Sequence, residues 1–387
     1  MKNNWKIYML AFISFLVGTS QFSIVGMLDK VAASVEVSVS TAGQLITIFA
    51  LANAIGTPIV IIAIARMNQR KQLLLALTII ILGSISTIAL PGFGFLVASR
   101  AILGIGTGVF VVTAYSIAGK LAPPERSGRA MSNVAMGFSS SLVFGVPIGR
   151  MVAASYDWKT IFWVIGLLSL LAAFAVARLI PATEGEASVP LGKRLSHLKN
   201  PKIAVTISVT FLVFTGYSIV NTYITPLLTA IMPMMEQKMS IILFTLGIGS
   251  LIGSKLSGFL SDKIGKVPTL IGSMVLQILA LTLVSISSGG VILAILLLMI
   301  WEIACWTFGP TQNFNLMSLA PEASGIVLSL NSSFVQFGFA AGAGIGGITM
   351  GGWSALAIPW ISVVSVVLGI VVFAFSFRYS TISKSHA

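Results

Sequence analysis

The sequence predicts an all-α membrane protein with twelve transmembrane helices in two pseudo-symmetric halves of six helices each. Three observations lead to this fold class. Of the 387 residues, 56% are hydrophobic and only 9% are charged, with a mean hydropathy of +1.01, whereas a soluble domain carries about 25% charged residues. Twelve apolar segments are long enough to cross a bilayer, which takes about 20 helical residues. Finally, landmark residues recur at a constant offset between the two halves.

The twelve apolar segments follow one another along the whole chain with short polar breaks. The first is too long for the apolar region of a signal peptide, and no convincing small-residue cleavage site follows it, so we expect it to remain as a span. The predicted spans are residues 6–28, 41–64, 72–90, 94–119, 129–153, 160–180, 204–229, 239–260, 267–287, 291–314, 325–350 and 353–377.

The distribution of Lys and Arg predicts the orientation of these spans. Of the 23 basic residues, seventeen lie in the two termini and the alternate loops that would share their side, and Arg100 and Lys255 lie within spans. The opposite loops hold only Lys30, Arg150, Lys159 and Lys238. We therefore expect a multi-pass inner-membrane protein with both termini in the cytoplasm. The net charge of +13 follows these loops, so it predicts contact with a lipid bilayer and no nucleic-acid partner.

The longest polar stretch, residues 181–203, follows the sixth span and is predicted to be a cytoplasmic linker. It separates an N-terminal six-helix bundle, residues 1–180, from a C-terminal bundle, residues 204–387. Five landmarks pair across this linker at one offset: Gly56 with Gly253, Arg66 with Lys263, Ser127-Gly128 with Ser324-Gly325, Gly145 with Gly342, and Gly149 with Gly346. Two parallel six-span repeats are an architecture of secondary transporters.

A charged loop between the eighth and ninth spans has the sequence Gly258-Phe-Leu-Ser-Asp262-Lys263-Ile-Gly265-Lys266. Its glycines permit a tight turn. Its carboxylate is suited to the partial positive charge of a helix N-terminus, such as that of the eleventh span near Ser324. The loop after the second span keeps its basic residues from Arg66 onward but has Ala65 at the Asp position. We interpret both loops as gating elements, with an ordinary charged loop as the alternative.

The fourth span contains Arg100 followed by Gly104, Gly106 and Gly108. An arginine within an apolar run costs about 2.5–3.5 kcal/mol on insertion scales, so it needs a compensating role. Two interpretations stay open. Arg100 is either a cationic centre that influences proton release or substrate binding, or a side chain that extends toward the outer interface.

The fifth span contains Gly137 and the run Gly145-Val-Pro147-Ile-Gly149. Small residues allow two helices to approach closely, and a proline bends a helix. These residues are predicted to seal the outer end of a central cavity. Generic helix packing is the alternative interpretation.

Together these motifs resemble those of the major facilitator superfamily. The loop at 258–266 is similar to its G-x-L-x-D-R-x-G-R/K signature and the fourth span to its R-x-x-x-G-x-G motif. The fifth span resembles its antiporter signature G-x(7)-G-P-x-x-G-G, although Val146 separates Gly from Pro and Arg150 replaces the last Gly. Nearly the whole chain is similar to the twelve-span drug:proton antiporter family, nearest its arabinose-efflux and purine-efflux permease branch, through residues 18–28 and 301–321. The resemblance implies the major facilitator fold and proton-coupled efflux.

Proton antiport needs a group that binds a proton in one state and releases it in another, and a carboxyl group can do so as its hydration changes. In the branch that the chain resembles, a Glu often occupies the position of Gln21, and Gln cannot titrate. Glu302 is the only acid deep inside a span. We expect Glu302 to carry the proton or contact a cationic substrate, or else to be a static partner of Arg100 or of backbone donors. Asp29, at the outer end of the first span, is the weaker candidate.

Amide and aromatic side chains at mid-depth are candidates for a substrate cavity, because they can hydrogen-bond and stack on a flat neutral ligand. Each is about as suited to joining two helices. Few cavity charges favour a small neutral or weakly polar substrate, such as a drug, a purine or nucleoside, or a sugar. The candidates are Gln21, Asn53, Tyr115, Tyr217, Asn221, Tyr223, Trp306, Gln312, Asn313, Asn331 and Gln336.

Other classes of function find little support. The single cysteine, Cys305, excludes an internal disulfide and a cysteine-cluster metal site, and His197 and His386 lie outside the spans. We therefore expect no metal, no cofactor and no enzyme activity, and a monomer. A membrane sensor or scaffold would usually carry a sizeable soluble domain, and none is evident. An importer or uniporter of the same fold remains the main alternative to the exporter.

Overall fold

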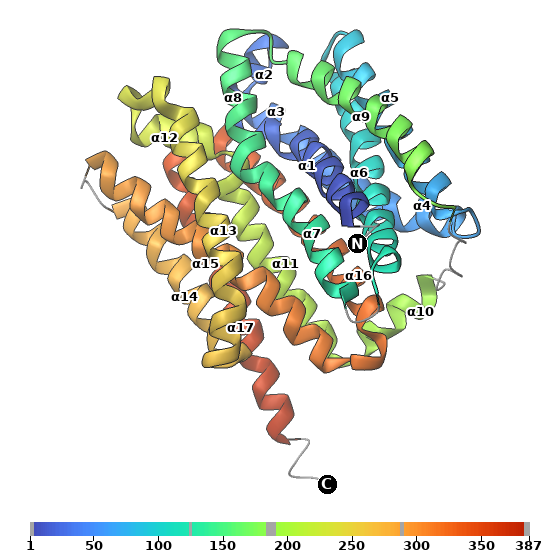
Figure 1. Cartoon of the computed structure of the whole chain (residues 1–387). Coiled ribbons are helices and arrows are strands. Elements are labelled where there is room, and N and C mark those ends of the chain that lie inside the picture. The colour runs from blue at the N-terminus through green and yellow to red at the C-terminus, as the bar shows by residue number, and fades with distance from the viewer. Residues whose placement is uncertain (1–3, 124–125, 183–190, 287–289, 383–387) are drawn as a thin grey trace. The chain divides into compact units, whose positions relative to one another are not determined.

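The computed structural model describes residues 4–123, 126–182, 191–286 and 290–382, and all regular elements in these residues are helices (Figure 1). Twelve of these helical stretches are long and apolar enough to cross a membrane, which confirms the predicted fold class. Each overlaps one predicted span and differs from it by a few residues at most ends. They are Asn4–Gly26, Val39–Ala63, Gln69–Ala89, Phe93–Leu121, Arg129–Ser155, Thr160–Leu179, Pro201–Thr222, Met239–Lys263, Lys266–Ile286, Gly290–Leu319, Pro321–Gly352 and Ala355–Ala374.

The helices form two compact units. The first comprises Met1–Val189 with Gln237–Phe244, and the second comprises Pro190–Glu236 with Thr245–Ala387. Residues 183–190 of the predicted linker lie outside the described residues, and its remainder includes the short helices α10 (Leu191–Ser196) and η4 (His197–Lys199). The division of the chain into bundles at residues 180 and 204 stays a prediction.

The first unit contains the first six spans. The second and third spans begin at a capping side chain: Ser38 and Asn68 accept hydrogen bonds from the backbone N–H groups of Thr41 and Arg70. The elements are α1 (Asn4–Gly26), α2 (Leu28–Ser34), α3 (Val39–Leu51), η1 (Ala52–Gly56), α4 (Thr57–Ala63), α5 (Gln69–Ala89), α6 (Phe93–Leu121), α7 (Ser127–Ser140), η3 (Ser141–Gly145), α8 (Val146–Ser155) and α9 (Thr160–Leu179).

The second and fifth spans each contain one turn of π-helix, η1 and η3. In both spans the next α-helix has a proline in its first turn, Pro58 or Pro147. A proline has no N–H to donate and crowds the preceding turn, so the backbone must deviate there. At the matching positions of the second half stand Lys255 and Gly344, and the helices that contain them are uninterrupted.

The second unit contains the later spans, most of which begin and end close to the predicted limits. Its longer elements are α11 (Pro201–Thr222), α12 (Ile224–Ile231), α13 (Met239–Lys263), of which the first six residues belong to the first unit, α14 (Lys266–Ile286), α15 (Gly290–Leu319), α16 (Ser324–Gly352) and α17 (Ile358–Ile382). The predicted single span at 204–229 was wrong in one respect, because the helix breaks at Tyr223. The first span breaks within one residue of the repeat-equivalent position, between Gly26 and Leu28.

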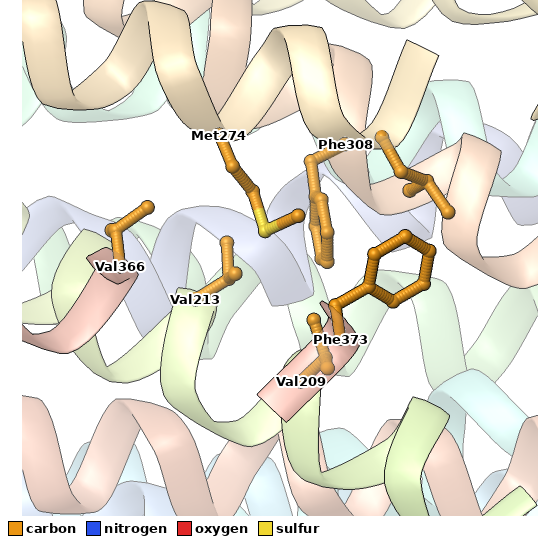
Figure 2. Close-up of a cluster of buried hydrophobic side chains, with 7 residues drawn as sticks. Val209, Val213, Met274, Phe308, Val366 and Phe373 are labelled. Atoms are coloured by element: carbon orange, nitrogen blue, oxygen red, sulfur yellow. The ribbon is translucent and has the colours of Figure 1, made fainter. Parts of the chain in front are cut away.

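A buried apolar cluster joins four helices of the second unit (Figure 2). It brings side chains of α11, α14, α15 and α17 together, and burying each such side chain contributes about 1.5–3 kcal/mol relative to water exposure. This packing fixes α15, the helix that carries Glu302, against α11. The cluster consists of Val209, Val213, Leu270, Met274, Phe308, Val366 and Phe373.

Candidate functional site

Glu302 lies in the middle of α15 and is buried, with 4% of its surface exposed. Its Oε1 atom accepts a hydrogen bond from Nε1 of Trp306, one turn along the helix, at 2.9 Å. The same oxygen accepts a second hydrogen bond from the hydroxyl of Tyr217 in α11, at 3.3 Å. Three residues that were predicted separately are therefore in contact, and two aromatic donors hold one oxygen of the carboxyl group.

Aromatic rings surround this carboxyl group. The ring of Tyr217 stacks on Trp301 with centroids 5.4 Å apart and an interplanar angle of 20°. It also meets Trp306 and Phe339 edge to face, at 6.4 Å and 5.7 Å. Trp301 and Phe339 were not predicted as site residues, because a single apolar aromatic in a span gives no signal of what it faces. Such ring pairs favour these geometries and hold the Tyr217 hydroxyl in place.

Glycines of α13 let its backbone approach α15 beside this site. A Cβ atom at Gly249 would lie 3.4 Å from Cβ of Glu302, and one at Gly253 would lie 3.0 Å from Cβ of Trp306. Larger residues at these positions would push the two helices apart. Gly253, which the sequence repeat pairs with Gly56, thus allows α13 to pack closely against α15.

The other cavity candidates of the second unit fall into two groups. Asn331 donates from Nδ2 to Oδ1 of the exposed Asn313 at 2.8 Å, while its own Oδ1 and the Oε1 of Gln336 have no hydrogen-bond partner among the described residues. Asn221 is half-buried. By contrast, Tyr223 and Gln312 join helices: the Tyr223 hydroxyl donates to the carbonyl of Ala343 and Gln312 Nε2 to that of Thr206.

Arg100 lies near the start of α6 and is buried, with 1% of its surface exposed. Its Nη1 donates to the backbone carbonyl of Ser20 in α1 at 3.1 Å, and its guanidinium carbon lies 4.6 Å from the ring centroid of Phe162 in α9. The side chain therefore packs inside the first unit and does not extend to an exposed position. Its Nη2 has no hydrogen-bond partner among the described residues.

Asp29 of α2 forms an ion pair with Arg150 of α8. One nitrogen, Nη1 of Arg150, donates to both carboxylate oxygens of Asp29, at 2.6 Å and 2.8 Å. The Arg150 side chain is 5% exposed and that of Asp29 is 30% exposed. A second bridge between the same regions runs from Nε1 of Trp158 to the hydroxyl of Ser34 at 2.7 Å. Arg150, noted in the sequence as an outer-loop charge and as a departure from a glycine motif, thus has a structural partner.

The remaining candidates of the first unit take part in no hydrogen-bond network among the described residues. Gln21 is half-buried, and its Oε1 has no partner among the described residues. Asn53 lies in the π-turn η1 and is 9% exposed. Tyr115 is half-buried in α6. A Cβ atom at Gly108 would press against the Thr57 hydroxyl and lie 2.9 Å from the Asn53 side-chain oxygen, so Gly108 lets the second and fourth spans meet at these two residues.

The loop at 258–266 turns at Gly265, whose φ of +92° is a conformation that side chains disfavour. Lys266 donates to the Ser318 hydroxyl at 2.6 Å, and Lys263 lies over the ring of Phe259. Asp262 is exposed and has no hydrogen-bond partner among the described residues, so its contact with the eleventh span stays a prediction. A Cβ atom at Gly258 would meet open space.

In the first-half loop, Arg66 is exposed, and the loop is held by a residue that was not predicted. Nε2 of Gln72 donates to the backbone carbonyls of Ile64 and Met67, at 3.0 Å and 2.9 Å. An amide that replaces missing backbone partners stabilises a turn in this way. Gln72 is buried at 7% exposure. In the sequence it ends the polar run at residues 68–72, so nothing distinguished it from an ordinary loop residue.

The glycines of the fifth span face α1. A Cβ atom at Gly145 would lie 2.6 Å from the Thr19 hydroxyl oxygen, and one at Gly149 would lie 3.0 Å from Cβ of Ser23. Pro147 is buried in the first turn of α8. Close helix approach is thus the local role of these glycines. Their role in sealing a cavity stays a prediction.

Among the described residues, no three His, Cys, Asp or Glu side chains lie close enough together to hold a metal ion. The described residues of these two units therefore offer one buried carboxyl group with aromatic donors, the buried guanidinium groups of Arg100 and Arg150, and several amides. Such groups bind and release protons and hydrogen-bond to organic molecules.

The sequence profile of the Major Facilitator Superfamily matches residues 10–343. The chain is 42% identical over 371 residues to the uncharacterized MFS-type transporter YbcL of Bacillus subtilis (strain 168), covering 96% of this chain and 95% of that protein.

Two solved transporter structures show the same fold. A mutant of the nucleoside transporter NupG matches with a TM-score of 0.77 and 15% identity, over 96% of this chain and 99% of that one. A bacterial homolog of the human lysosomal transporter Spinster, inward-facing and unoccupied, matches with a TM-score of 0.73 and 15% identity, over 98% and 97%.

Proposed function

Since the chain belongs to the major facilitator superfamily, whose members are transporters and not enzymes, we propose that it is a proton-coupled exporter of a small organic molecule. The substrate would be neutral or weakly polar, of the drug, purine, nucleoside or sugar type. The protein would work as a monomer in the inner membrane, with both termini in the cytoplasm. Its two six-helix halves would alternate access to a central cavity.

One observation carries the proposal: the carboxyl group of Glu302 is buried in a membrane span and held by two neutral donors. An intramembrane acid is costly and marks a functional site by default. Tyr217 and Trp306 donate to Oε1 and need no positive charge to do so. The carboxyl group is therefore free to gain and lose a proton without breaking an ion pair.

The remaining candidates take secondary roles in this proposal. Arg100 and Asp29 would influence proton release from the first unit, and Asp29 would have to exchange its partner Arg150 to do so. The loop residues Asp262, Lys263 and Lys266, with Arg66 in the first half, would open and close the cytoplasmic end. The glycines and proline at 145–149 would close the outer end.

Counterflow in proteoliposomes tests the proposal. A panel of purines, nucleosides, sugars and hydrophobic cations identifies a substrate, and transport is then measured with and without a pH gradient. In Glu302→Gln, which keeps the size and can still accept both hydrogen bonds, the pH gradient should no longer drive accumulation, while counterflow of substrate should persist. Gln277 is a buried amide of α14. Gln277→Ala is therefore the control for the loss of a buried polar side chain elsewhere in a span. Unchanged pH-driven transport in Glu302→Gln would refute Glu302 as the proton site.

The alternative is a uniporter or importer of the same fold without proton coupling. Gln21, at a position where the resembling branch often has a titratable Glu, favours it. In that case the wild-type protein would equilibrate substrate at the same rate at all pH gradients, and Glu302→Gln would change substrate affinity alone.

A further inference from the structure

Among the described residues of its own unit, the buried guanidinium of Arg100 has no negative partner. The helices α1 to α9 hold one carboxylate, that of Asp29, and Arg150 binds both of its oxygens. The described acids of the connecting loops, Glu36 and Asp157, are exposed. Arg100 itself has one described hydrogen bond, to a neutral carbonyl, and one ring contact. A buried charge without compensation is strongly unfavourable. A molecule that brings a negative charge to Nη2 would supply the missing partner.

A second polar group near Arg100 also lacks a partner. The hydroxyl of Ser20 is fully buried and has no hydrogen-bond partner among the described residues. Its backbone carbonyl is the acceptor for Nη1 of Arg100, so α1 brings an unused hydroxyl donor to the vicinity of the guanidinium. Guanidinium and hydroxyl groups together suit a carboxylate, which accepts several hydrogen bonds and favours the planar geometry of Arg.

An apolar groove of about 430 Å³ lies between α5 and α9 of the same unit. Its walls include Ile85, Gly166 and Leu170, and Phe162 forms part of the lining. Phe162 is fully buried, and the guanidinium carbon of Arg100 lies 4.6 Å from the centroid of its ring. Phe162 is therefore both a lining residue of the apolar groove and the aromatic contact of the Arg100 guanidinium. In Figure 1, α5 runs beside both α6 and α9.

The shape of the groove depends on a small residue. Gly166 has only Ser84 near its missing side chain, with 3.5 Å from an added Cβ to Cβ of Ser84. Ile85, Trp163 and Leu167 on its rim are 49%, 62% and 61% exposed. Both α5 and α9 are membrane spans, so this rim faces hydrocarbon. A hydrophobic chain reaches it by lateral movement in the bilayer.

We propose that Arg100 and this groove form a binding site for an amphiphilic organic anion, with an alkyl chain in the groove and a carboxylate at Arg100. Phe162 is the side chain that must rotate to join the two parts. The groove volume lies within the range of small-molecule pockets, in which apolar walls surround a few polar groups. Charge complementarity selects the anion: a cation of the same length would meet Arg100 with repulsion, and a neutral chain would leave it unpaired.

Binding to the full chain in lipid nanodiscs tests the site without any gradient, so the result is independent of proton coupling. Radiolabelled decanoate, decanol and decyltrimethylammonium are compared, and binding to empty nanodiscs is subtracted. Decanoate should bind more tightly than the other two. Its affinity should fall about fourfold for each methylene removed toward hexanoate, as expected for about 0.8 kcal/mol per buried methylene.

Variants test the contribution of the Arg100 charge and that of the groove separately. Arg100→Gln should weaken decanoate binding at least about tenfold and leave decanol unchanged, while Arg100→Lys should retain part of the affinity. Gly166→Leu should fill the groove and flatten the chain-length series. Lys255→Gln, which removes an exposed positive charge from another span, and Gly272→Leu, at an exposed helix position with no atom near its missing side chain, should change neither.

Three results would overturn the proposal. Decanoate that binds no more tightly than decanol excludes a charge contact. Equal decanoate affinity in wild type, Arg100→Gln and Arg100→Lys excludes Arg100, and the ligand comparison in wild type decides the matter if Arg100→Gln does not fold. Acetate that displaces decanoate at equal concentration shows a small-anion site without the groove.

Discussion

Gly342 in α16 offers a sharp test of how closely the helices of the second unit pack. A Cβ atom at this position would press against the backbone carbonyl of Thr215 and lie 2.6 Å from Cβ of Ser218 and 3.0 Å from the backbone nitrogen of Ile219. All three neighbours belong to α11. A backbone cannot rotate away as a flexible side chain can, so Gly342→Ala requires the two helices to separate.

The size of the effect follows from two opposing contributions. Overpacking costs about 1–3 kcal/mol, and Ala in place of Gly within a helix gains about 0.5–1 kcal/mol. Separation of the helices would also stretch the hydrogen bond from the Ser218 hydroxyl to the carbonyl of Phe339, now 2.8 Å long. We expect a net loss of about 1–2 kcal/mol, or a few degrees in Tm.

The single cysteine provides the assay. Cys305 is buried in α15 of the same unit, so a thiol-reactive dye reports its exposure as purified protein is heated. Gly272→Ala in α14 is the matched control, because no atom lies within 4 Å of its added Cβ, and its midpoint should stay equal or rise. A Gly342→Ala midpoint at or above that of Gly272→Ala would refute the packing argument.

The spans could be predicted because lipid imposes a minimum length of apolar helix on the sequence. The breaks within them could not. A hydropathy pattern is the same on both sides of Tyr223, where α11 ends, and of Met27, where α1 gives way to α2. The repeat offset pairs Tyr223 with Gly26, the neighbour of Met27, but only the backbone shows that both places are breaks. The π-turns before Pro58 and Pro147 are a similar case, since a proline indicates a deviation without indicating its type.

The candidate site could be predicted only in part, because single residues stand out in the sequence whereas their partners do not. Glu302 stands out because it is the only acid deep in a span, but its hydrogen bond to Tyr217 joins residues 85 positions apart. The ion pair of Asp29 with Arg150 joins residues 121 positions apart. A single sequence without relatives to compare gives no information on such pairs, because they depend on which helices are neighbours. Arg100 was recognised as costly, but its burial against Phe162 required the structure.

Two further predictions concern the first unit. Gly145→Ala should cost less stability than its repeat partner Gly342→Ala, because the nearest atom to the added Cβ is the Thr19 hydroxyl oxygen, which belongs to a side chain that can rotate. The fraction of protein that stays soluble after heating compares the two, and equal losses would contradict this reasoning. In a double-mutant cycle, Asp29→Asn and Arg150→Gln should show a coupling energy of about 1–2 kcal/mol, between the values for exposed and buried pairs, because Arg150 is buried and Asp29 is partly exposed. Additive effects of the two substitutions would show that the ion pair contributes nothing beyond its separate charges.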